Sequence, residues 1–242
     1  MPEPRSWPLV VASVQDVTPD MRRIRLTSPT LEAFDYLPGQ DMALGILVDA
    51  RGMVRRRYTI RRFDRDRRLL DLDIVMHGDG PGIRWARAAH PGVAIEAIGP
   101  RGKISPAADA DWHLFAGDAT AVPGSFAMME ALPGRVRARA YLEVEGPDER
   151  QLEIASAPNK TVSWRYASDR YEQPPGGLVA AVSAPEVSPA GGHAYLAGEV
   201  ALVSGLKAAL LARGWGADQI SAKAYWNRGR PNAGHGEPEL KV

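Results

Sequence analysis

The hydrophobic pattern of the chain changes near residue 105, and this change constrains the fold more than any other feature. Before that point, short segments alternate apolar and polar residues, as in LLDLDIVMH, whose inward positions are Leu70, Leu72, Ile74 and Met76. A period of two is typical of strands with one buried face. After that point, apolar strand segments alternate with helical patterns, which is typical of a parallel sheet covered by helices. We therefore predict a β + α/β protein: an N-terminal antiparallel β-barrel domain (1–107) followed by a parallel-sheet α/β domain (108–242).

The first domain contains enough strand segments to close a barrel. The stretch VVASVQDVTPDMRRIRLTS (10–28) holds two alternating runs, whose inward positions are Val11, Val14, Ile24 and Leu26. Further strand segments are MALGILVD (42–49), RRYTIRRF (56–63), LLDLDIVMH (69–77) and VAIEAIGPRG (93–102). About six strands fit a small antiparallel barrel. One short helix, IRWARAA (83–89), interrupts them, and Pro81 and Gly82 are typical of its start.

The second domain repeats a strand–helix pattern after the linker SPAADAD (105–111). Its predicted strands are WHLFAG (112–117), RVRARAYLEV (135–144), TVSWRYA (161–167), HAYLAG (193–198) and ISAKAYW (220–226). Its predicted helices are PGSFAMMEAL (123–132) and EVALVSGLKAALLARG (199–214), with Leu202, Leu206, Ala209 and Leu210 on one face of the second and Gly214 at its end. The polar tail 230–242, rich in Pro and Gly, is expected to be flexible.

Composition excludes several functional classes. The chain has no cysteine, so disulfides, iron–sulfur clusters and thiolate metal sites are excluded. Its five histidines lack metal-ligand spacing, so we expect no metal centre. No segment resembles a signal peptide or membrane span, so we expect a cytoplasmic protein with no membrane partner. The oligomeric state is not encoded in any visible pattern, and a monomer is the default expectation.

The segment RRYTIRR (56–62) places arginines on both sides of a strand core. A solvated edge strand, a nucleic-acid patch and a phosphate clamp beside a planar ring all fit this pattern. Eight arginines fall between Arg55 and Arg68, but the formal net charge is only +1, which counts against a nucleic-acid partner. Arg57 shares a strand face with Thr59, and the two could bind a diphosphate, while Tyr58 on the other face could meet a planar cofactor.

Three turns suit phosphate or nucleotide binding, although each also fits an ordinary connection. The glycine-rich GDGPG (78–82) lies between a strand and a helix, where backbone N–H groups meet a positive helix end. It is not the G-x-G-x-x-G dinucleotide fingerprint. In the second domain, AGDAT (116–120) and AGE (197–199) each follow an apolar strand and precede a helix. The carboxyl ends of strands in open α/β sheets are where ligands bind.

Taken in order, these segments resemble one family. The motifs R-R-Y-T-I-R, V-M-H-G-D-G-P-G-I-R-W-A, P-G-V-A-I-E-A-I-G-P-R-G, A-G-D-A-T-A-V-P, A-G-E and A-Y-W-N-R-G are similar to those of the siderophore-interacting proteins. These are FAD-dependent ferric-siderophore reductases within the ferredoxin-reductase-like group. The resemblance runs from about Val10 to Gly229. It implies an FAD-binding barrel, an NAD(P)H-binding α/β domain, and electron transfer from NADH or NADPH through FAD to a ferric siderophore, which releases Fe(II).

The resemblance also assigns residues by position. For FAD it implies Arg57, Tyr58, Thr59, Ile60, Met76, His77, Gly80, Pro81, Gly82 and Trp85. For the nicotinamide cofactor it implies Asp118, Thr120, Gly198 and Glu199. For the anionic ferric chelate, basic side chains near the flavin edge are implied: Arg55, Lys103, Lys223 and Arg228. No general acid or base is required, because the flavin carries the electrons.

One departure from the family pattern concerns the donor. The family usually reads G-D-E-T-A-L-P-A where this chain has GDATAVPG (117–124), so Ala119 replaces a glutamate. This change bears on nicotinamide binding and leaves another electron donor as an alternative. Arg139 and Arg165 are candidates for a 2′-phosphate, although surface arginines on strands are common. Two rival functions stay open: a flavin reductase of the same fold with another acceptor, and a non-catalytic flavin- or siderophore-binding protein.

Overall fold

A computed structural model of the protein describes residues 5–48, 52–151, 158–168 and 177–228. The chain divides into two compact units, called here the barrel unit (1–105 with 126–128) and the sheet unit (106–125 with 129–242). The domain boundary predicted between residues 107 and 108 stays a prediction. The predicted tail 230–242 lies outside the described residues.

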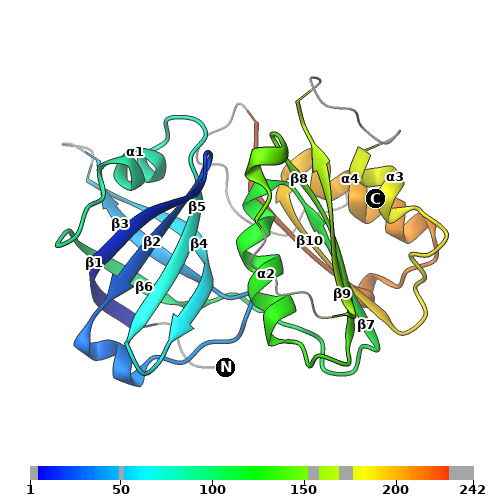
Figure 1. Cartoon of the computed structure of the whole chain (residues 1–242), viewed down its shortest axis with the longest axis horizontal. Coiled ribbons are helices and arrows are strands. Elements are labelled where there is room, and N and C mark those ends of the chain that lie inside the picture. Colours follow the sequence, from blue (N-terminus) through cyan, green and yellow to red (C-terminus); the bar gives the residue numbers. More distant parts are fainter. Residues whose placement is uncertain (1–4, 49–51, 152–157, 169–176, 229–242) are drawn as a thin grey trace. The chain divides into compact units, whose positions relative to one another are not determined.

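The barrel unit is a closed antiparallel barrel, as predicted. Its strands follow the order β1-β2-β5-β4-β3-β6, and every neighbouring pair runs antiparallel. Figure 1 shows them in blue to green. Their bounds are β1 Arg5–Thr18, β2 Met21–Thr27, β3 Asp41–Leu47, β4 Met53–Asp64, β5 Leu69–Val75 and β6 Ala94–Arg101. The barrel unit also holds the 3-10 helix η1 Pro29–Ala33 and the helix α1 Pro81–Ala88.

Alternating apolar residues fill the barrel, as the period of two predicted. The buried core includes Val11, Ile24, Leu26, Leu70, Leu72 and Ile74. Val14 and Met76 are only partly buried and pack against this core. Burying these side chains contributes the main driving force for folding, roughly 25 cal/mol for each Å² of apolar surface.

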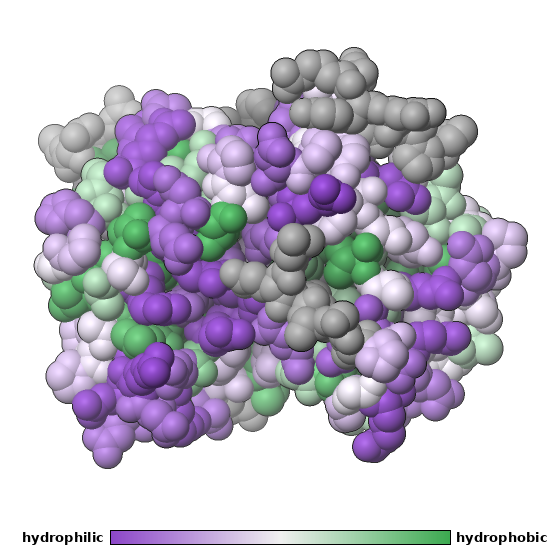
Figure 2. All heavy atoms as spheres, viewed as in Figure 1, coloured by the Kyte–Doolittle hydropathy of each residue, from purple (hydrophilic) through white to green (hydrophobic). Residues whose placement is uncertain are grey.

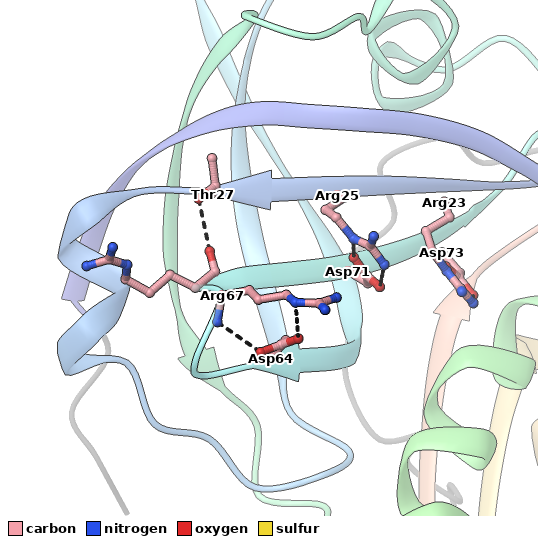
Figure 3. Close-up of polar contacts among 8 residues, drawn as sticks. Arg23, Arg25, Thr27, Asp64, Arg67, Asp71 and Asp73 are labelled. Carbon is pink, nitrogen blue, oxygen red and sulfur yellow. Dashed lines mark hydrogen bonds and ion pairs between the residues drawn. The ribbon is translucent and has the colours of Figure 1, made fainter.

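The polar positions of β5 are buried too, which the alternation did not predict. Asp71 and Asp73 each accept two hydrogen bonds from an arginine of β2, at 2.7 and 2.8 Å for both pairs (Figure 3). Arg25 binds Asp71 and Arg23 binds Asp73, so the register between β2 and β5 places opposite charges side by side. Bidentate pairing compensates for the loss of water around each carboxylate.

The β4–β5 turn is held by polar groups of its own and by Thr27 at the end of β2. Arg67 donates its backbone N–H to Asp64, and Thr27 donates its hydroxyl to the carbonyl of Arg68 (Figure 3). Arg68 has a φ of +55°, the left-handed conformation that ends many tight turns.

The sheet unit contains a five-stranded parallel sheet, which confirms the parallel-sheet α/β fold predicted for the second part of the chain. The strand order is β11-β10-β7-β8-β9, with parallel pairing throughout. The strands are β7 Trp112–Gly117, β8 Arg137–Val144, β9 Lys160–Tyr166, β10 Gly192–Glu199 and β11 Ile220–Trp226. Its helices are α3 Gly177–Val182 and α4 Val200–Ala212, with the 3-10 turns η3 Ala119–Ala121, η4 Pro147–Glu149 and η5 Ala217–Gln219. Helix α2 Val122–Ala131 follows η3 in the chain, and its residues 126–128 are assigned to the barrel unit.

Helices α3 and α4 pack on one face of this sheet, where Figure 1 shows them side by side. The buried residues of α4 are Val203, Leu206 and Leu210, and Leu202 and Ala209 lie partly buried beside them. Gly214 follows the helix with a φ of +85°, so it terminates α4 as predicted. Helix α3 was not predicted from the sequence, since six residues are too few to show a helical period.

Polar side chains cover most of the visible surface, with apolar ones between them (Figure 2). Leu47 is the most exposed large apolar side chain among the described residues, at 83%. No helix in the described part of the chain is both long and apolar enough to cross a membrane.

Candidate functional site

Tyr58 on β4 lies directly against the first turn of α1. A Cβ atom added to Gly82 would lie 2.0 Å from the Tyr58 hydroxyl oxygen, so only glycine lets the helix approach this closely. The tyrosine side chain also packs against the barrel core. Burial raises the pKa of Tyr58 to about 12, and the nearby positive charge of Arg56 opposes that rise. Tyr58 is therefore neutral at physiological pH and can only donate or accept hydrogen bonds.

Arg57 is bound to a carboxylate inside the barrel unit. Its Nε and Nη2 donate to the two oxygens of Asp41, at 2.8 and 2.6 Å. The Asp41 side chain is only 3% exposed and that of Arg57 is 27% exposed. The guanidinium fork thus joins β3 to β4, and its predicted contact with a flavin phosphate stays a prediction.

Arg56 lies beside Tyr58 and the start of α1, and it is not among the cofactor residues predicted from the sequence. Its Cγ lies 3.4 Å from the position of a Gly82 Cβ, beside Tyr58 and the start of α1. Its Nη1 donates to the carbonyl of Arg55 at 2.8 Å. The signal was present in the sequence, because Arg56 and Tyr58 are two residues apart and so share one strand face.

The other predicted flavin residues differ in burial. Thr59 is buried on β4, and Ile60 belongs to the barrel core, so the Ile60 side chain faces the barrel interior. Met76 is partly buried against that core, whereas His77 is exposed. Trp85 is partly buried and packs on the core from α1, which agrees with an apolar role for much of its ring.

The glycine-rich turn before α1 is open to a ligand. An added Cβ at Gly78 or Gly80 would meet no atom within 4 Å, and no side chain caps the first turn of the helix. Asp79 in this turn is neutralised by Arg84 and Arg87, whose Nη1 atoms lie 3.3 and 3.2 Å from its carboxylate oxygens. An anion can therefore approach the backbone amides and the positive helix end.

A second candidate site lies in the sheet unit, at the carboxyl ends of β7 and β10. From β7 the chain continues to β8 and β9 on one side, then returns to β10 and β11 on the other. This reversal makes the edge between β7 and β10 the topological switch point, where open α/β sheets bind ligands. Asp118, Thr120, Gly198 and Glu199 all lie there, so the structure brings the four predicted nicotinamide residues together.

Asp118 joins three strand ends at this point. Its Oδ1 accepts hydrogen bonds from the backbone N–H and the hydroxyl of Thr120, at 2.9 and 2.5 Å. Its Oδ2 accepts from the Glu199 backbone N–H at 2.7 Å and from the Trp226 indole N–H at 2.9 Å. All of these contacts form with Ala119 in place, so the turn keeps its closure without a carboxylate at position 119.

Glu199 is occupied as a helix cap. Its Oε2 accepts hydrogen bonds from the backbone N–H groups of Ala201 and Leu202, at 2.6 and 3.1 Å, and so caps α4. Its Oε1 lies 3.4 Å from the backbone N of Arg228. The carboxylate of Glu199 therefore orders the start of α4.

Two glycines let β7 and β10 converge. A Cβ on Gly117 would lie 1.9 Å from the carbonyl oxygen of Ala197, and one on Gly198 would lie 2.6 Å from Asp118. Gly198 has a φ of +135°, which side-chain-bearing residues rarely adopt. Glycine is thus required at both strand ends.

Glu143 on β8 is a further ionisable group near this site. Burial raises the pKa of its carboxyl group, and the negative charge of Asp118 raises it further. Neither Glu143 nor Trp226 was singled out as a cofactor residue from the sequence, because only the fold brings β8 and β11 to the switch point.

The four basic residues predicted for the substrate belong to different units. Arg55 and Lys103 are exposed in the barrel unit, and Arg228 is exposed in the sheet unit. Lys223 is partly buried, with its ammonium 5.5 Å from the Tyr225 ring centroid. Their common role stays a prediction. In the described part of the chain, no group of three acidic or histidine side chains is arranged to hold a metal ion.

Family models match both units of the chain. Residues 47–104 match the siderophore-interacting FAD-binding domain, and residues 110–229 match the siderophore-interacting protein model. The ferric vibriobactin reductase ViuB of Vibrio cholerae is 33% identical over 186 residues, which cover 73% of this chain and 66% of ViuB. An uncharacterized protein of Mycobacterium tuberculosis, Rv2895c, is 33% identical over 218 residues, or 85% of this chain and 73% of that protein.

Solved structures agree with these matches. A siderophore utilization protein from T. fusca has a TM-score of 0.83 at 28% identity, covering 97% of both chains. A ferredoxin NADP+ reductase from Neisseria gonorrhoeae shares the fold at 16% identity, with a TM-score of 0.73 over 91% of this chain and 99% of that one.

A closed barrel and a parallel sheet in one chain define a protein with the ferredoxin-reductase-like fold. Within that class, the chain belongs to the siderophore-interacting protein family, which confirms the resemblance seen in the sequence.

Proposed function

We propose that the protein is a flavin-dependent ferric-siderophore reductase that passes electrons from NADH or NADPH through FAD to a ferric siderophore and releases Fe(II) in the cytoplasm. The observation that carries this proposal is the convergence of Arg56, Tyr58 and Gly82 at the start of α1. These residues lie within the segment that matches the FAD-binding family model. The similarity to a ferric vibriobactin reductase supports the choice of acceptor.

The residues at the start of α1 fit a flavin diphosphate. The backbone at Gly78 and Gly80 is open, so phosphate oxygens can approach the amides without meeting a side chain. Arg56 would supply positive charge beside them, while Arg84 and Arg87 neutralise Asp79. Each charge-assisted hydrogen bond contributes about 1.5–3 kcal/mol.

When bound, FAD would accept a hydride from a nicotinamide and give single electrons to iron. The protein's part is to bind and orient the reactants. Tyr58 stays protonated, since its pKa is about 12, and so adds no negative charge beside the diphosphate. Reduction of iron from Fe(III) to Fe(II) weakens its attraction to oxygen ligands, and the siderophore releases it.

The donor would bind at the switch point of the sheet unit. Thr120, Gly198 and the strand ends around them form its candidate surface. This surface suits both NADH and NADPH, because it carries an acidic and a basic side chain. Glu143 lies near the end of β8, and Arg165 lies opposite it on β9. Arg139 lies on the same face of β8 as Glu143 but nearer the amino end of the strand, so Arg165 is the better placed of the two arginines for a 2′-phosphate.

The ferric chelate would be attracted by basic side chains. Arg55 and Lys103 in the barrel unit and Lys223 and Arg228 in the sheet unit are the candidates for this role. Their charges would act mainly on the rate of encounter with an anionic chelate, and we expect that rate to fall as salt rises.

Two measurements test the proposal. The visible absorption spectrum of the purified protein, taken after adding FAD and desalting, should keep the flavin bands. The flavin-loaded protein should then reduce ferric chelates with NADH or NADPH, as followed by trapping Fe(II). A folded but colourless protein would contradict the flavin site. If the protein keeps flavin but turns over only with quinones or free flavin, the acceptor is one of these and not a ferric siderophore. Retained flavin without turnover would make the protein a binding protein.

A further inference from the structure

The Asp118 carboxylate reaches three strand ends in the sheet unit. Thr120 follows β7, Glu199 ends β10 and Trp226 ends β11, and each donates to this one carboxylate. Each of its two oxygens accepts two hydrogen bonds, and an ionised carboxylate can accept about four in all. Little capacity is left on Asp118 for a ligand.

The hydrogen bond that Trp226 donates to Asp118 requires the tryptophan side chain to pass over the end of β10. β11 pairs with β10, and β10 pairs with β7, so Trp226 and Asp118 lie on strands separated by β10. The pairing between β10 and β11 shifts register between Gly198 and Glu199, where Trp226 pairs with Glu199. Such bulges re-aim side chains at strand ends. The indole thus extends over the carboxyl end of β10, at the switch point.

Trp226 therefore offers an aromatic surface in the nucleotide crevice. Trp226 is only partly buried, and its N–H is held at 2.9 Å by Asp118. A tryptophan that is anchored through its N–H can still present its ring to a planar ligand. The Thr120 hydroxyl, at 2.5 Å from the same carboxylate, is fixed in the turn η3 that follows β7.

We infer that Asp118 is a positioning residue for nicotinamide binding: it holds the Trp226 indole and the Thr120 hydroxyl in place, and these two groups, rather than Asp118 itself, meet the nicotinamide end of the donor. This inference rests on the proposed function, since it names how the donor site is built. It also explains why the turn AGDAT (116–120) keeps its hydrogen bonds with alanine at position 119.

The test uses the flavin-loaded full chain and variants with matched controls. Trp226→Phe removes the anchoring N–H and keeps a ring, whereas Trp215→Phe removes an indole N–H that has no hydrogen-bond partner among the described residues. Thr120→Val removes the hydroxyl and Thr120→Ser restores it. Asp118→Asn replaces one acceptor oxygen by an amide donor, so two of the four donors lose their acceptor.

The readouts are the dissociation constant of NADH, from the quenching of tryptophan emission, and KM against kcat for the donor. We expect Trp226→Phe and Thr120→Val to raise the dissociation constant and KM about tenfold, the effect of one lost hydrogen bond, and Asp118→Asn to raise both at least as much. The kcat value at saturating donor and the FAD affinity should stay within about twofold. Trp215→Phe and Thr120→Ser should match the wild type, and Trp226→Phe should lose part of the NADH-induced quenching.

Three results would overturn the inference. An effect of Asp118→Asn without any effect of Trp226→Phe or Thr120→Val would make Asp118 a direct ligand. Unchanged donor binding in all three variants would remove the network from the donor site, while flavin retention and turnover left the proposed function standing. A wild-type protein that keeps FAD but binds neither NADH nor NADPH would overturn the inference together with the donor assignment.

Discussion

Arg57 and Asp41 form a bidentate ion pair that joins β4 to β3, with N···O distances of 2.8 and 2.6 Å. The neighbouring arginine, Arg56, lies instead beside Gly82 at the start of α1. Adjacent residues on a strand point to opposite faces, so the two arginines have different surroundings. The structure therefore separates a stabilising arginine from a phosphate-binding candidate.

Replacing each arginine by alanine should affect a different property of the protein. Arg57→Ala removes the bidentate ion pair to the buried Asp41 carboxylate, and we expect a loss of about 2–3 kcal/mol in the free energy of unfolding. Arg56→Ala should leave stability within about 0.5 kcal/mol and weaken FAD binding about tenfold or more. Urea unfolding of the flavin-free protein and titration with FAD measure the two quantities.

Arg55→Ala is the matched control for both arginine variants, because Arg55 is exposed on the same strand. It should change neither quantity. If Arg57→Ala weakened FAD binding and left stability unchanged, the roles of the two arginines would have to be exchanged.

The contact between Gly82 and Tyr58 predicts a coupling between two substitutions. Gly82→Ala would place a Cβ 2.0 Å from the tyrosine hydroxyl, and we expect a cost of about 1–3 kcal/mol from overpacking. In a Tyr58→Phe background the hydroxyl is gone, so the same substitution should cost less than half as much. A double-mutant cycle on unfolding free energies measures this coupling. Equal costs in both backgrounds would contradict the contact.

Gly117 should tolerate alanine less well than Gly82. Its Cβ would lie 1.9 Å from the backbone carbonyl oxygen of Ala197, which cannot rotate away as a side chain can. We expect Gly117→Ala to cost more than about 3 kcal/mol, because β7 and β10 must separate. Gly134→Ala is the control, since nothing lies within 4 Å of its added Cβ. Thermal unfolding of both variants tests the difference, and similar melting temperatures would refute it.

His113 should make stability depend on pH. Its ring is 1% exposed, and burial lowers its pKa from 6.5 to about 4, with a smaller contribution from His193. Its Nδ1 lies 3.2 Å from the Tyr195 hydroxyl, which also accepts the Ala107 backbone N–H at 2.7 Å. A depressed histidine pKa means that the unfolded chain binds the proton more readily. The contribution of the neutral His113 side chain to stability is therefore complete above pH 6.5 and is lost as pH falls towards 4.

The corresponding measurement is the unfolding free energy of wild type and His113→Gln across this pH range. Glutamine does not titrate, so the variant should show a smaller loss between pH 6.5 and 4, by up to about 3 kcal/mol. His193 also has a pKa lowered by burial, and it remains in both proteins as an internal reference. Parallel pH profiles for the two proteins would exclude His113 as the source.

The local pattern of the sequence was sufficient for the fold class. In the barrel unit, strict alternation marked Leu70, Leu72 and Ile74 as core, and they are buried. In the sheet unit, apolar strands followed by helical periods predicted parallel pairing, because a parallel connection needs a crossover long enough for a helix. These properties depend on neighbours within a few residues, so they can be read from one chain. The family motifs, which are contiguous, were recognisable for the same reason.

The tertiary structure decided the partners of the polar residues. Alternation placed Asp71 and Asp73 on the polar face of their strand, yet both are buried, because β2 supplies Arg25 and Arg23 at the same register. Likewise, RRYTIRR places Arg56 on one strand face with Tyr58, but it does not show that Asp41 binds Arg57 or that Gly82 lies beside Arg56. A pairing between distant segments depends on strand order and register, which a single local pattern does not contain.

The same limit applies to the candidate donor site. The turns AGDAT and AGE were visible in the sequence, and the sheet brings them to one edge. The bond from Trp226 to Asp118 spans 108 residues and crosses the end of β10, so it depends on the pairing of β11 with β10 and of β10 with β7. Residue type and period determined which elements form, whereas the side chains that meet at the switch point were decided by the packing of the whole sheet.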